Sequence, residues 1–329
     1  KFKRMIQAGI IGGAGYTAGE LIRLLLTHPK VDINFVYSTS SAGKKISAIH
    51  QDLEGVTNQL FTDSVQTEVD VLFLCLGHGN SKVFLENYTF SKATKIIDLS
   101  NDFRLTKDAR FQNKHFVYGL PELNKSAIQS AQYIANPGCF ATAIQLAILP
   151  LANNNLITDS IHVNAVTGAT GAGTALSATS HFTWRVDNFS HYKAFNHQHL
   201  GEIHQSVNSL QEGLQSVIHL IPNRGNFSRG IFATIYTTYE GTLEMALSLF
   251  KSYYKDADFT FISDTSIHLK QVVNTNKCLL HLEVHQGKLL ITSIIDNLLK
   301  GASGQAVHNM NLMYRFEAHL GLQLKANYF

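Results

Sequence analysis

Short apolar segments, bounded by glycine and polar residues, recur through the first half of the chain and predict buried parallel strands. These segments are 5–11, 31–37, 69–76 and 95–100, with a shorter one at 133–135. The first leads into the glycine turn 12–19 and then into an apolar run with helical spacing at 20–26. Strand, turn and helix in this order are typical of a βα unit in an open parallel sheet.

The pattern changes from about Asn155 onward, where apolar and polar residues alternate in short segments. These segments are 161–166, 230–236, 277–284 and 288–295. Alternation of this kind predicts the strands of a mixed, mostly antiparallel sheet. Helices are expected around 200–210 and 244–254, and a long amphipathic helix should run through Met313. A last helix of this kind often packs back on the first domain, although periodicity alone does not show it here.

The glycine turn after the first strand has the features of a dinucleotide-binding loop. Glycines there let the backbone approach a pyrophosphate, which the N-terminus of the following helix attracts. The alternative is an ordinary βα turn. The cofactor-binding residues expected in this turn are Gly12, Gly13, Ala14, Gly15, Tyr16 and Thr17.

The end of the second strand predicts which cofactor the loop takes. NAD-binding folds usually place an acidic residue there to hold the ribose 2′-hydroxyl. Here the strand runs into Ser38, Ser40 and Ser41, followed by two lysines, with no carboxylate to repel a 2′-phosphate. We therefore expect NADP(H) in preference to NAD, the alternative being a flexible polar loop. Gly77, after the strand 69–76, should face the same cofactor.

Cys139 is the strongest candidate for chemistry in the sequence. It follows Asn136-Pro137-Gly138 and opens an apolar run with helical spacing, so it should begin a helix. The unpaired N–H groups and the dipole at a helix N-terminus favour a thiolate, which is a strong nucleophile toward acyl carbons. The alternative is a buried structural cysteine. The local sequence leaves both readings open.

Three further features are weaker candidates. His197 and His199 precede the predicted helix 200–210, but the chain has 16 histidines, and a metal site lacks a convincing further ligand set. Arg104 follows a strand end and could clamp an anion or form a surface ion pair. The glycine-rich loop 167–173, which includes Gly168, suggests close backbone approach to a ligand.

Composition excludes several classes of protein. The 329 residues are 45% hydrophobic and 16% charged, as in a soluble enzyme of about two domains. The net charge of +3 gives no reason to expect nucleic acid, and no apolar run approaches the length of a membrane span. No signal peptide is visible, and three cysteines without regular spacing suit a reducing cytoplasm.

These motifs together resemble the N-acetyl-gamma-glutamyl-phosphate reductase family, within the aspartate-semialdehyde dehydrogenase-like superfamily. The resemblance runs from end to end, with its landmarks in the family's order. They are the glycine turn 12–17, Asp98–Arg104, Tyr118–Leu123, Asn136–Cys139, Thr167–Gly173, His197–His199 with Glu202, and Asp296–Ala302. Two residues depart from the family pattern, Ala18 in place of glycine and Gln198 in place of arginine.

The resemblance implies a role for each landmark. Cys139 would be the nucleophile that forms a thioester, and His197 or His199 the acid/base. Asn297 would belong to the cofactor surround. The implied substrate-binding residues are Arg104, Asn136, Glu202, Arg229 and Lys300. The substrate would be an acyl phosphate, with the acyl group (acetyl, succinyl or carrier-linked) left open.

The expected fold is therefore α/β, with a Rossmann-type NADP-binding domain and an α+β catalytic and dimerisation domain. We expect the first domain to comprise 1–140 with 300–329 and the second to comprise 141–299. A cytoplasmic homodimer or homotetramer is expected. The alternatives are an aminoadipyl-phosphate reductase, an aspartate-semialdehyde dehydrogenase, or a non-catalytic nucleotide-sensing protein that has no need of Cys139.

Overall fold

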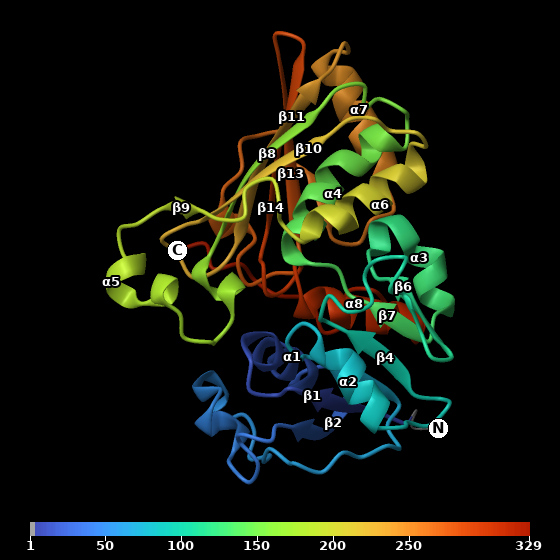
Figure 1. The fold of residues 1–329 in the computed structure, drawn as a ribbon, viewed down its shortest axis with the longest axis vertical. Coiled ribbons are helices and arrows are strands. Elements are labelled where there is room, and N and C mark those ends of the chain that lie inside the picture. Colours follow the sequence, from blue (N-terminus) through green and yellow to red (C-terminus); the bar gives the residue numbers. More distant parts are fainter. Residues whose placement is uncertain (1–3) are drawn as a thin grey trace. The chain divides into compact units, whose positions relative to one another are not determined.

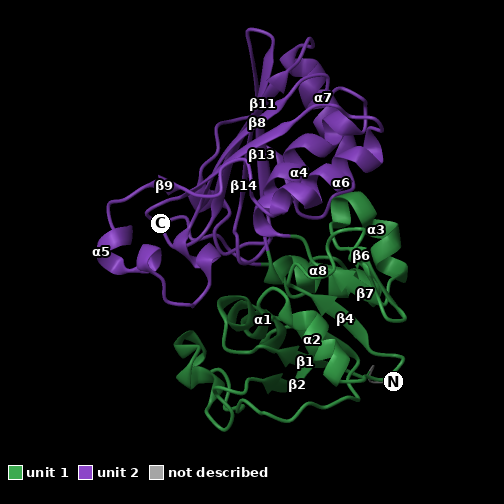
Figure 2. Ribbon diagram, in the orientation of Figure 1, with its two compact units in different colours: residues 1–137, 302–323 green, residues 138–301, 324–329 purple. Residues whose placement is uncertain are grey.

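The computed structural model describes residues 4–329 and divides into two compact units (Figure 2). The first unit runs to Pro137 and includes Ala302–Gln323, and the second comprises Gly138–Gly301 with Leu324–Phe329. Cys139 and Lys300, which the sequence expectation assigned to the first domain, thus belong to the second unit. The reason is that the helix that Cys139 begins packs on the second sheet.

A seven-stranded sheet in the order β2-β1-β3-β4-β7-β6-β5 forms the first unit (Figure 1). Its strands are β1 (Ile6–Ile11), β2 (Val31–Tyr37), β3 (Val71–Leu74), β4 (Lys95–Asp98), β5 (Arg110–Phe111), β6 (Lys114–Tyr118) and β7 (Tyr133–Ala135). All neighbours pair parallel except β5 with β6. Because β1 lies between β2 and β3, the strand order reverses there, which is where open α/β sheets bind ligands.

Four α-helices accompany this sheet. They are α1 (Tyr16–Leu26), α2 (Asn80–Asn87), α3 (Pro121–Ser130) and α8 (Ser303–Met313). α8 contacts both α1 and α3, and all of its residues are buried. The expectation of an amphipathic last helix was therefore wrong. Two of its polar side chains bond to neighbouring segments: Asn309 Nδ2 donates to the Gly119 carbonyl at 2.9 Å, and Asn311 Oδ1 lies 3.1 Å from His28 Nε2.

The second unit contains a mixed sheet in the order β12-β13-β14-β11-β8-β10-β9. Its strands are β8 (Ile161–Thr167), β9 (Ser190–His191), β10 (Ile218–Arg224), β11 (Ile231–Thr238), β12 (Thr260–Ile262), β13 (Cys278–His285) and β14 (Lys288–Ile295). Two of the six strand pairs are parallel, and the other four are antiparallel. The predicted mixed, mostly antiparallel sheet is confirmed.

Helices cover one face of this second sheet (Figure 1). The α-helices of the second unit are α4 (Cys139–Ala152), α5 (Phe182–Arg185), α6 (His199–Leu210) and α7 (Leu243–Tyr253), and its 3₁₀ helices are η3 (Ala169–Ala172), η4 (Ala178–Ser180) and η5 (Leu269–Gln271). The first unit also has two 3₁₀ helices, η1 (Ile46–Ala48) and η2 (Gln51–Leu53). α4 packs on β11 and β14, with α6 and α7 beside it. α4 is almost entirely apolar and buried, which anchors its first residue.

The opposite sheet face carries stacked rings. His162 stacks on Tyr236 with ring centroids 4.8 Å apart and on His219 at 5.0 Å. A hollow of about 330 Å³ lies over these rings and is also lined by Phe195, which is 60% exposed.

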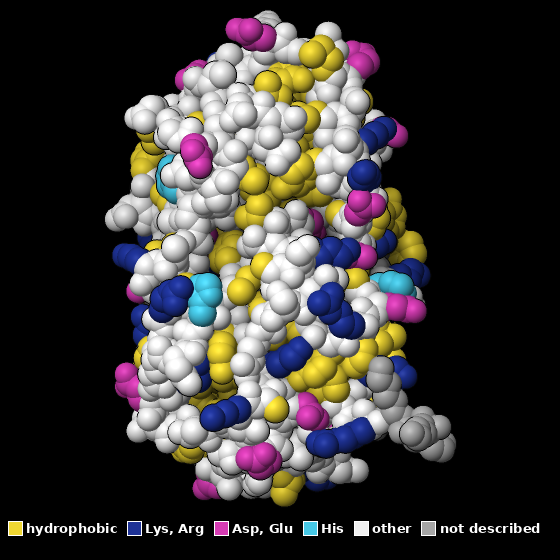
Figure 3. Space-filling view, turned by 90° about the vertical axis from the view of Figure 1, so that its right-hand side faces the viewer, with side chains coloured by type: hydrophobic (Ala, Val, Ile, Leu, Met, Phe, Trp, Pro, Cys, Tyr) yellow, Lys and Arg dark blue, Asp and Glu magenta, His cyan; other side chains and the backbone are white. Residues whose placement is uncertain are grey.

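Charged side chains of both signs lie on the face of the molecule that Figure 3 draws. Figure 3 shows lysine, arginine and acidic side chains interspersed with uncharged ones on the face that it draws. Among residues 4–329, no helix is both long and apolar enough to span a membrane.

Candidate active site

Cys139 is the first residue of α4, as predicted from the sequence. Gly138 precedes it in an extended conformation (φ −72°, ψ 152°), and its carbonyl accepts hydrogen bonds from the Thr142 N–H at 2.8 Å and hydroxyl at 3.1 Å. Cys139 is partly exposed, whereas the rest of the helix is buried. The first-turn N–H groups are those that an α-helix leaves without an intrahelical acceptor, so they can stabilise negative charge beside this thiol.

Glu202 connects the start of α4 to a histidine of α6. Its Oε2 accepts the Gly138 N–H at 2.9 Å, and its Oε1 lies 3.9 Å from His199 Nε2. Glu202 and His199 expose only 2% and 6% of their surface. The carboxylate therefore holds the imidazole against the residue that precedes the thiol, and it can stabilise an imidazolium there.

Two glycines make close packing around Cys139 possible. A Cβ atom at Gly138 would lie 2.4 Å from His199 Nε2, and one at Gly301 would lie 2.7 Å from Cys139 Cβ. Both positions thus require glycine because of the space available. The residue types that the sequence places around the thiol are the ones that let a histidine and the 296–301 turn approach it.

His197 is a poor proton donor at neutral pH. Burial, with a smaller contribution from the charge of Lys193, lowers its pKa to about 4. Its Nδ1 accepts the His199 N–H at 3.2 Å, which leaves the proton of the neutral ring on Nε2. Within residues 4–329, no group of three or more His, Cys, Asp or Glu side chains could hold a metal ion.

The turn after β14 is held by buried polar side chains. Arg229 Nη2 lies 3.0 Å from Asp296 Oδ2, and Asp296 also accepts the N–H groups of Asn274 at 2.7 Å and Leu298 at 2.8 Å. The charge of Arg229 is therefore balanced by a buried carboxylate. Lys300, in the same turn, is fully buried.

The side chain of Asn297 forms hydrogen bonds to two other segments of the second unit. Its Oδ1 accepts the Gly230 N–H at 2.7 Å, and its Nδ2 donates to Thr170 Oγ1 at 3.1 Å. Gly168 lies in the same region, where an added Cβ would be 2.4 Å from the Ser228 carbonyl oxygen. The sequence suggested that the backbone of the glycine-rich loop comes close to a ligand. In the structure, the backbone at Gly168 comes close to the loop that contains Ser228.

Arg104 and Asn136 lie in the first unit, and their side chains donate hydrogen bonds to main-chain carbonyl groups of the same unit. Arg104 is 6% exposed and donates through Nε to the Asn136 carbonyl at 2.8 Å and through Nη2 to the Leu99 carbonyl at 2.9 Å. Asn136 Nδ2 donates to the Ala302 carbonyl at 3.0 Å. These contacts fix the segment that leads to Pro137.

The glycine turn after β1 fits a pyrophosphate. Gly12 has a φ of +81° and Gly13 packs against β2, so a Cβ at these positions would lie 2.6 Å from the Cys75 carbonyl oxygen and 2.3 Å from Val36 Cγ1, respectively. Gly15 precedes α1 without a side-chain cap, and no atom lies within 4 Å of a Cβ placed there. The helix N-terminus is thus open at the position where an anion would bind.

The other expected cofactor residues lie around this turn. Ala14 is half-buried, Tyr16 is 43% exposed, and the Thr17 carbonyl accepts the Ser303 hydroxyl at 2.6 Å. Gly77 follows β3, close to the side chain of Asn80.

The end of β2 carries hydroxyl groups. Ser38 Oγ lies 3.4 Å from Ser40 Oγ. Ser38 and Ser41 are buried, whereas Ser40 is exposed. This strand end offers hydroxyl groups and has no carboxylate to repel a 2′-phosphate, so the residues present fit NADP(H).

Sequence reasoning missed three residues that extend outward from His197. Tyr192 meets His197 edge-on with ring centroids 5.8 Å apart, and the guanidinium of Arg224 lies 4.7 Å from the Tyr192 ring centroid. Arg185 ends α5, beside Arg224. Separate sequence segments supply these residues, and no local motif connects them.

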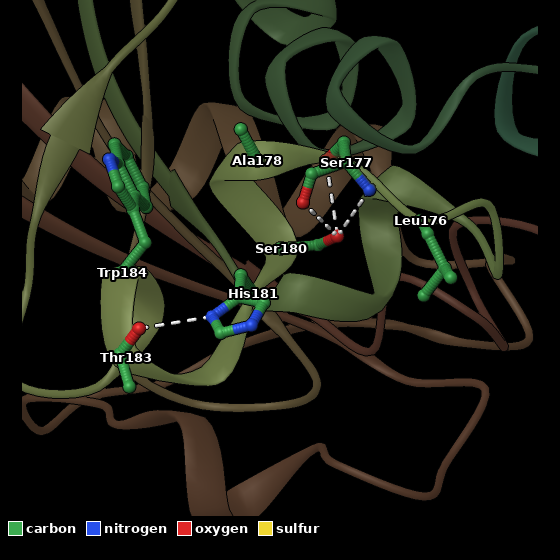
Figure 4. Close-up of a pocket in the computed structure, with 7 residues that line it drawn as sticks. All are labelled: Leu176, Ser177, Ala178, Ser180, His181, Thr183 and Trp184. Carbon is green, nitrogen blue, oxygen red and sulfur yellow. Dashed lines mark hydrogen bonds between the residues drawn. The ribbon is translucent and has the colours of Figure 1, made fainter.

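A hollow of about 670 Å³ lies beside α5 (Figure 4). It is lined by Leu176, Ser177, Ala178, Ser180, His181, Thr183 and Trp184. In Figure 4 the His181 ring points toward the Thr183 hydroxyl, to which it is hydrogen-bonded at 3.0 Å.

Family models match most of the chain. Residues 7–131 match the model described as semialdehyde dehydrogenase, NAD binding domain, and residues 139–297 match semialdehyde dehydrogenase, dimerisation domain. Solved structures with the same fold include a probable aspartate-semialdehyde dehydrogenase from Pseudomonas aeruginosa. It has a TM-score of 0.71 at 14% identity, over 95% of this chain and 99% of that one.

Curated relatives match over their full length. The chain is 65% identical to the N-acetyl-gamma-glutamyl-phosphate reductase of Christiangramia forsetii over 99% of this chain and 100% of the relative. Identity to the proteins of the same name from Flavobacterium johnsoniae and Bacteroides thetaiotaomicron is 58% and 55%, with the same coverage.

Proposed function

Because the chain belongs to the semialdehyde dehydrogenase family, we propose that it is an NADPH-dependent N-acetyl-gamma-glutamyl-phosphate reductase of arginine biosynthesis. It would convert the acyl phosphate to N-acetylglutamate semialdehyde and inorganic phosphate. Full-length relatives at 55–65% identity carry that name. The observation that carries the chemistry is the partly exposed Cys139 at the start of α4, with Glu202 bonded to Gly138 and adjoining His199.

In this proposal the sulfur of Cys139 attacks the acyl-phosphate carbon. A sulfur–carbon bond forms, the bond from that carbon to the phosphate oxygen breaks, and a thioester remains. The imidazolium of His199, stabilised by the Glu202 carboxylate, gives its proton to the departing phosphate and regains one from water. His197 is not assigned this role, because its lowered pKa keeps it neutral.

The main-chain N–H groups at the start of α4 stabilise the oxyanion that forms at the carbon under attack. NADPH, held by the glycine turn and the serines after β2, would supply the hydride that reduces the thioester to the aldehyde level. Collapse of the resulting thiohemiacetal then expels the Cys139 thiolate and releases the semialdehyde.

The test is phosphate-dependent reduction of NADP in the presence of N-acetylglutamate semialdehyde, the reverse reaction. Cys139→Ala should abolish turnover and leave NADPH affinity near that of the unmodified chain. Cys278→Ala is the matched control, because Cys278 is buried in β13. More than a trace of activity in Cys139→Ala would rule out covalent catalysis by this residue.

Two further measurements separate the alternatives. Aspartate semialdehyde and aminoadipate semialdehyde in the same assay test the other reductases of this superfamily. Iodoacetamide near pH 7 should label Cys139 selectively, with protection by substrate. A protein that only senses nucleotide would bind NADPH and show neither turnover nor protection.

We also infer that the protein is a cytoplasmic homo-oligomer that pairs through the second sheet. The dimerisation-domain match covers that sheet, and its helix-free face carries the apolar rings of Phe195 and Tyr236. Light scattering after gel filtration should give a dimer or tetramer, and Tyr236→Arg should shift it toward monomer. An unchanged mass in the variant would exclude this face.

A further inference from the structure

Arg185 is a nearly buried cation whose hydrogen-bonding capacity is mostly unused. It exposes 8% of its surface, and Nη2 donates to the Asn188 carbonyl at 3.3 Å. Nε and Nη1 are buried with no hydrogen-bond partner. Unpaired donors on a buried charge are costly, so such a group indicates a partner that binds there.

Arg224 adds a second positive charge at the same place. It is the last residue of β10 and pairs in register with Ser190 of β9, five residues after Arg185. Its Nη1 donates to Thr179 Oγ1 at 3.1 Å. The charge of Arg224 contributes, after burial, to a lowered pKa of Arg185.

Neither arginine is neutralised within the part of the chain that the structure describes. No aspartate or glutamate there forms an ion pair with Arg185 or Arg224, in contrast to Arg229, which has Asp296. Two guanidinium groups of like charge are a strained arrangement that a bound carboxylate would relieve through charge-assisted hydrogen bonds.

Tyr192 connects this arginine pair to the catalytic cysteine. The guanidinium of Arg224 lies over the ring of Tyr192. The Tyr192 ring lies 5.8 Å from the ring of His197, which in turn lies 5.4 Å from the ring of Phe140, the residue after Cys139. Burial, and after it the charge of Cys139, raises the pKa of the Tyr192 phenol. An anion bound by the arginines would therefore be close to the reacting centre.

On this basis we propose that Arg185 and Arg224 bind a carboxylate of the substrate. The proposal rests on the proposed function, in which the acyl phosphate is at one end of a glutamyl skeleton and the α-carboxylate at the other. With the phosphate end at Cys139, the far end extends past Tyr192 toward the arginines. A carboxylate on the N-acyl group, as in an N-succinyl substrate, has the same chemistry and could take the same place.

The kinetic test compares three aldehydes in the reverse assay. They are N-acetylglutamate semialdehyde, N-succinylglutamate semialdehyde, and 4-acetamidobutanal, which lacks the α-carboxylate. Arg224→Gln and Arg185→Gln should raise KM by roughly 10- to 100-fold for a carboxylate-bearing substrate, with a much smaller change in kcat. Arg185→Lys, which keeps the charge, should recover part of the loss. Exposed Arg110→Gln is the matched control.

The substrates separate the two sources of the carboxylate. Equal KM increases for the acetyl and succinyl substrates, with none for 4-acetamidobutanal, assign the α-carboxylate to the arginines. An increase for the succinyl substrate alone assigns the acyl carboxylate. The same loss with 4-acetamidobutanal, or no loss with any substrate, overturns the proposal, because a purely structural role would not depend on the carboxylate.

A binding measurement keeps this proposal separate from the proposed function. Trp184 is the only tryptophan of the chain, and its ring lies 5.0 Å from the Arg185 guanidinium. Titration with N-acetylglutamate and N-succinylglutamate should change its fluorescence, with Kd raised roughly 10- to 100-fold in Arg224→Gln. Binding that survives unaltered in Arg224→Gln contradicts the carboxylate site. Absent reductase activity with arginine-dependent binding contradicts the proposed function alone.

Discussion

Gly138→Ala isolates the contact that holds His199 beside the nucleophile. The backbone at this position (φ −72°, ψ 152°) suits alanine, so the substitution introduces no backbone strain. The added methyl carbon would lie 2.4 Å from His199 Nε2, 2.6 Å from Cε1 and 2.7 Å from Cδ2. An ordinary van der Waals contact begins near 3.4 Å, so the ring must withdraw by about 1 Å.

The magnitude follows from that displacement. Overpacking of a tight site typically costs about 1–3 kcal/mol of stability. A misplacement of about 1 Å in a reacting group can cost about 100-fold in rate. We therefore expect kcat to fall about 100-fold, with NADPH affinity unchanged because the cofactor loop belongs to the first unit.

The assay is steady-state kinetics of NADP reduction together with urea unfolding, as a double-mutant cycle with His199→Ala. When the ring is absent, the extra methyl has space, so Gly138→Ala should cost little more in that background. If Gly138→Ala lowered kcat and stability equally in the presence of His199 and in the His199→Ala background, the reasoning would be refuted. Normal kcat in Gly138→Ala would refute it as well.

Three other predictions concern the remaining parts of the site. Asn297→Ala leaves the buried Gly230 N–H without its acceptor and should lower the free energy of unfolding by about 1–3 kcal/mol in urea titration. NADPH affinity should stay unchanged. A loss of NADPH affinity without a loss of stability would instead support a direct role of Asn297 in cofactor binding. Because the pKa of His197 falls from 6.5 to about 4 on folding, the unfolded chain binds the proton more tightly between these pH values, and about 3 kcal/mol of stability should be lost on acidification through that window. His197→Gln should lack this loss when urea midpoints at pH 7.5 and 4.5 are compared. Ser40→Asp, on the exposed end of β2, should weaken NADPH binding about tenfold without weakening NADH in fluorescence titrations, and equal weakening of both would contradict 2′-phosphate recognition there.

The bounds of strands and helices could be predicted where the residues of the segment itself carry the hydrophobic pattern. The strand 31–37 and the short strand 133–135 have the bounds expected from their apolar runs, and Cys139 begins a helix as its Pro-Gly turn indicated. A period of two or 3.6 residues records which side of an element faces the core, and a single sequence preserves that record.

Other features depend on contacts between segments that are distant in the chain. The helix before Tyr314 was expected to be amphipathic, yet α8 is buried on every side because α1 and α3 flank it. Thr17 of α1, His28 and Gly119 are among the partners of its polar groups. The strand β10, which ends at Arg224, was missed because His219, Pro222 and Asn223 interrupt its apolar residues.

The sequence by itself determined the two-sheet architecture, the carboxylate-free strand end after Tyr37 and a cysteine at a helix start. These features are local: glycine spacing, hydrophobic period and the absence of an acid at one position are all readable along the chain. Only the tertiary structure decided that Glu202 joins Gly138 to His199, and that Arg185 and Arg224 lie together with no ion-paired carboxylate among residues 4–329. Hydrogen bonds and unbalanced charges arise from proximity in space, which a single sequence does not record.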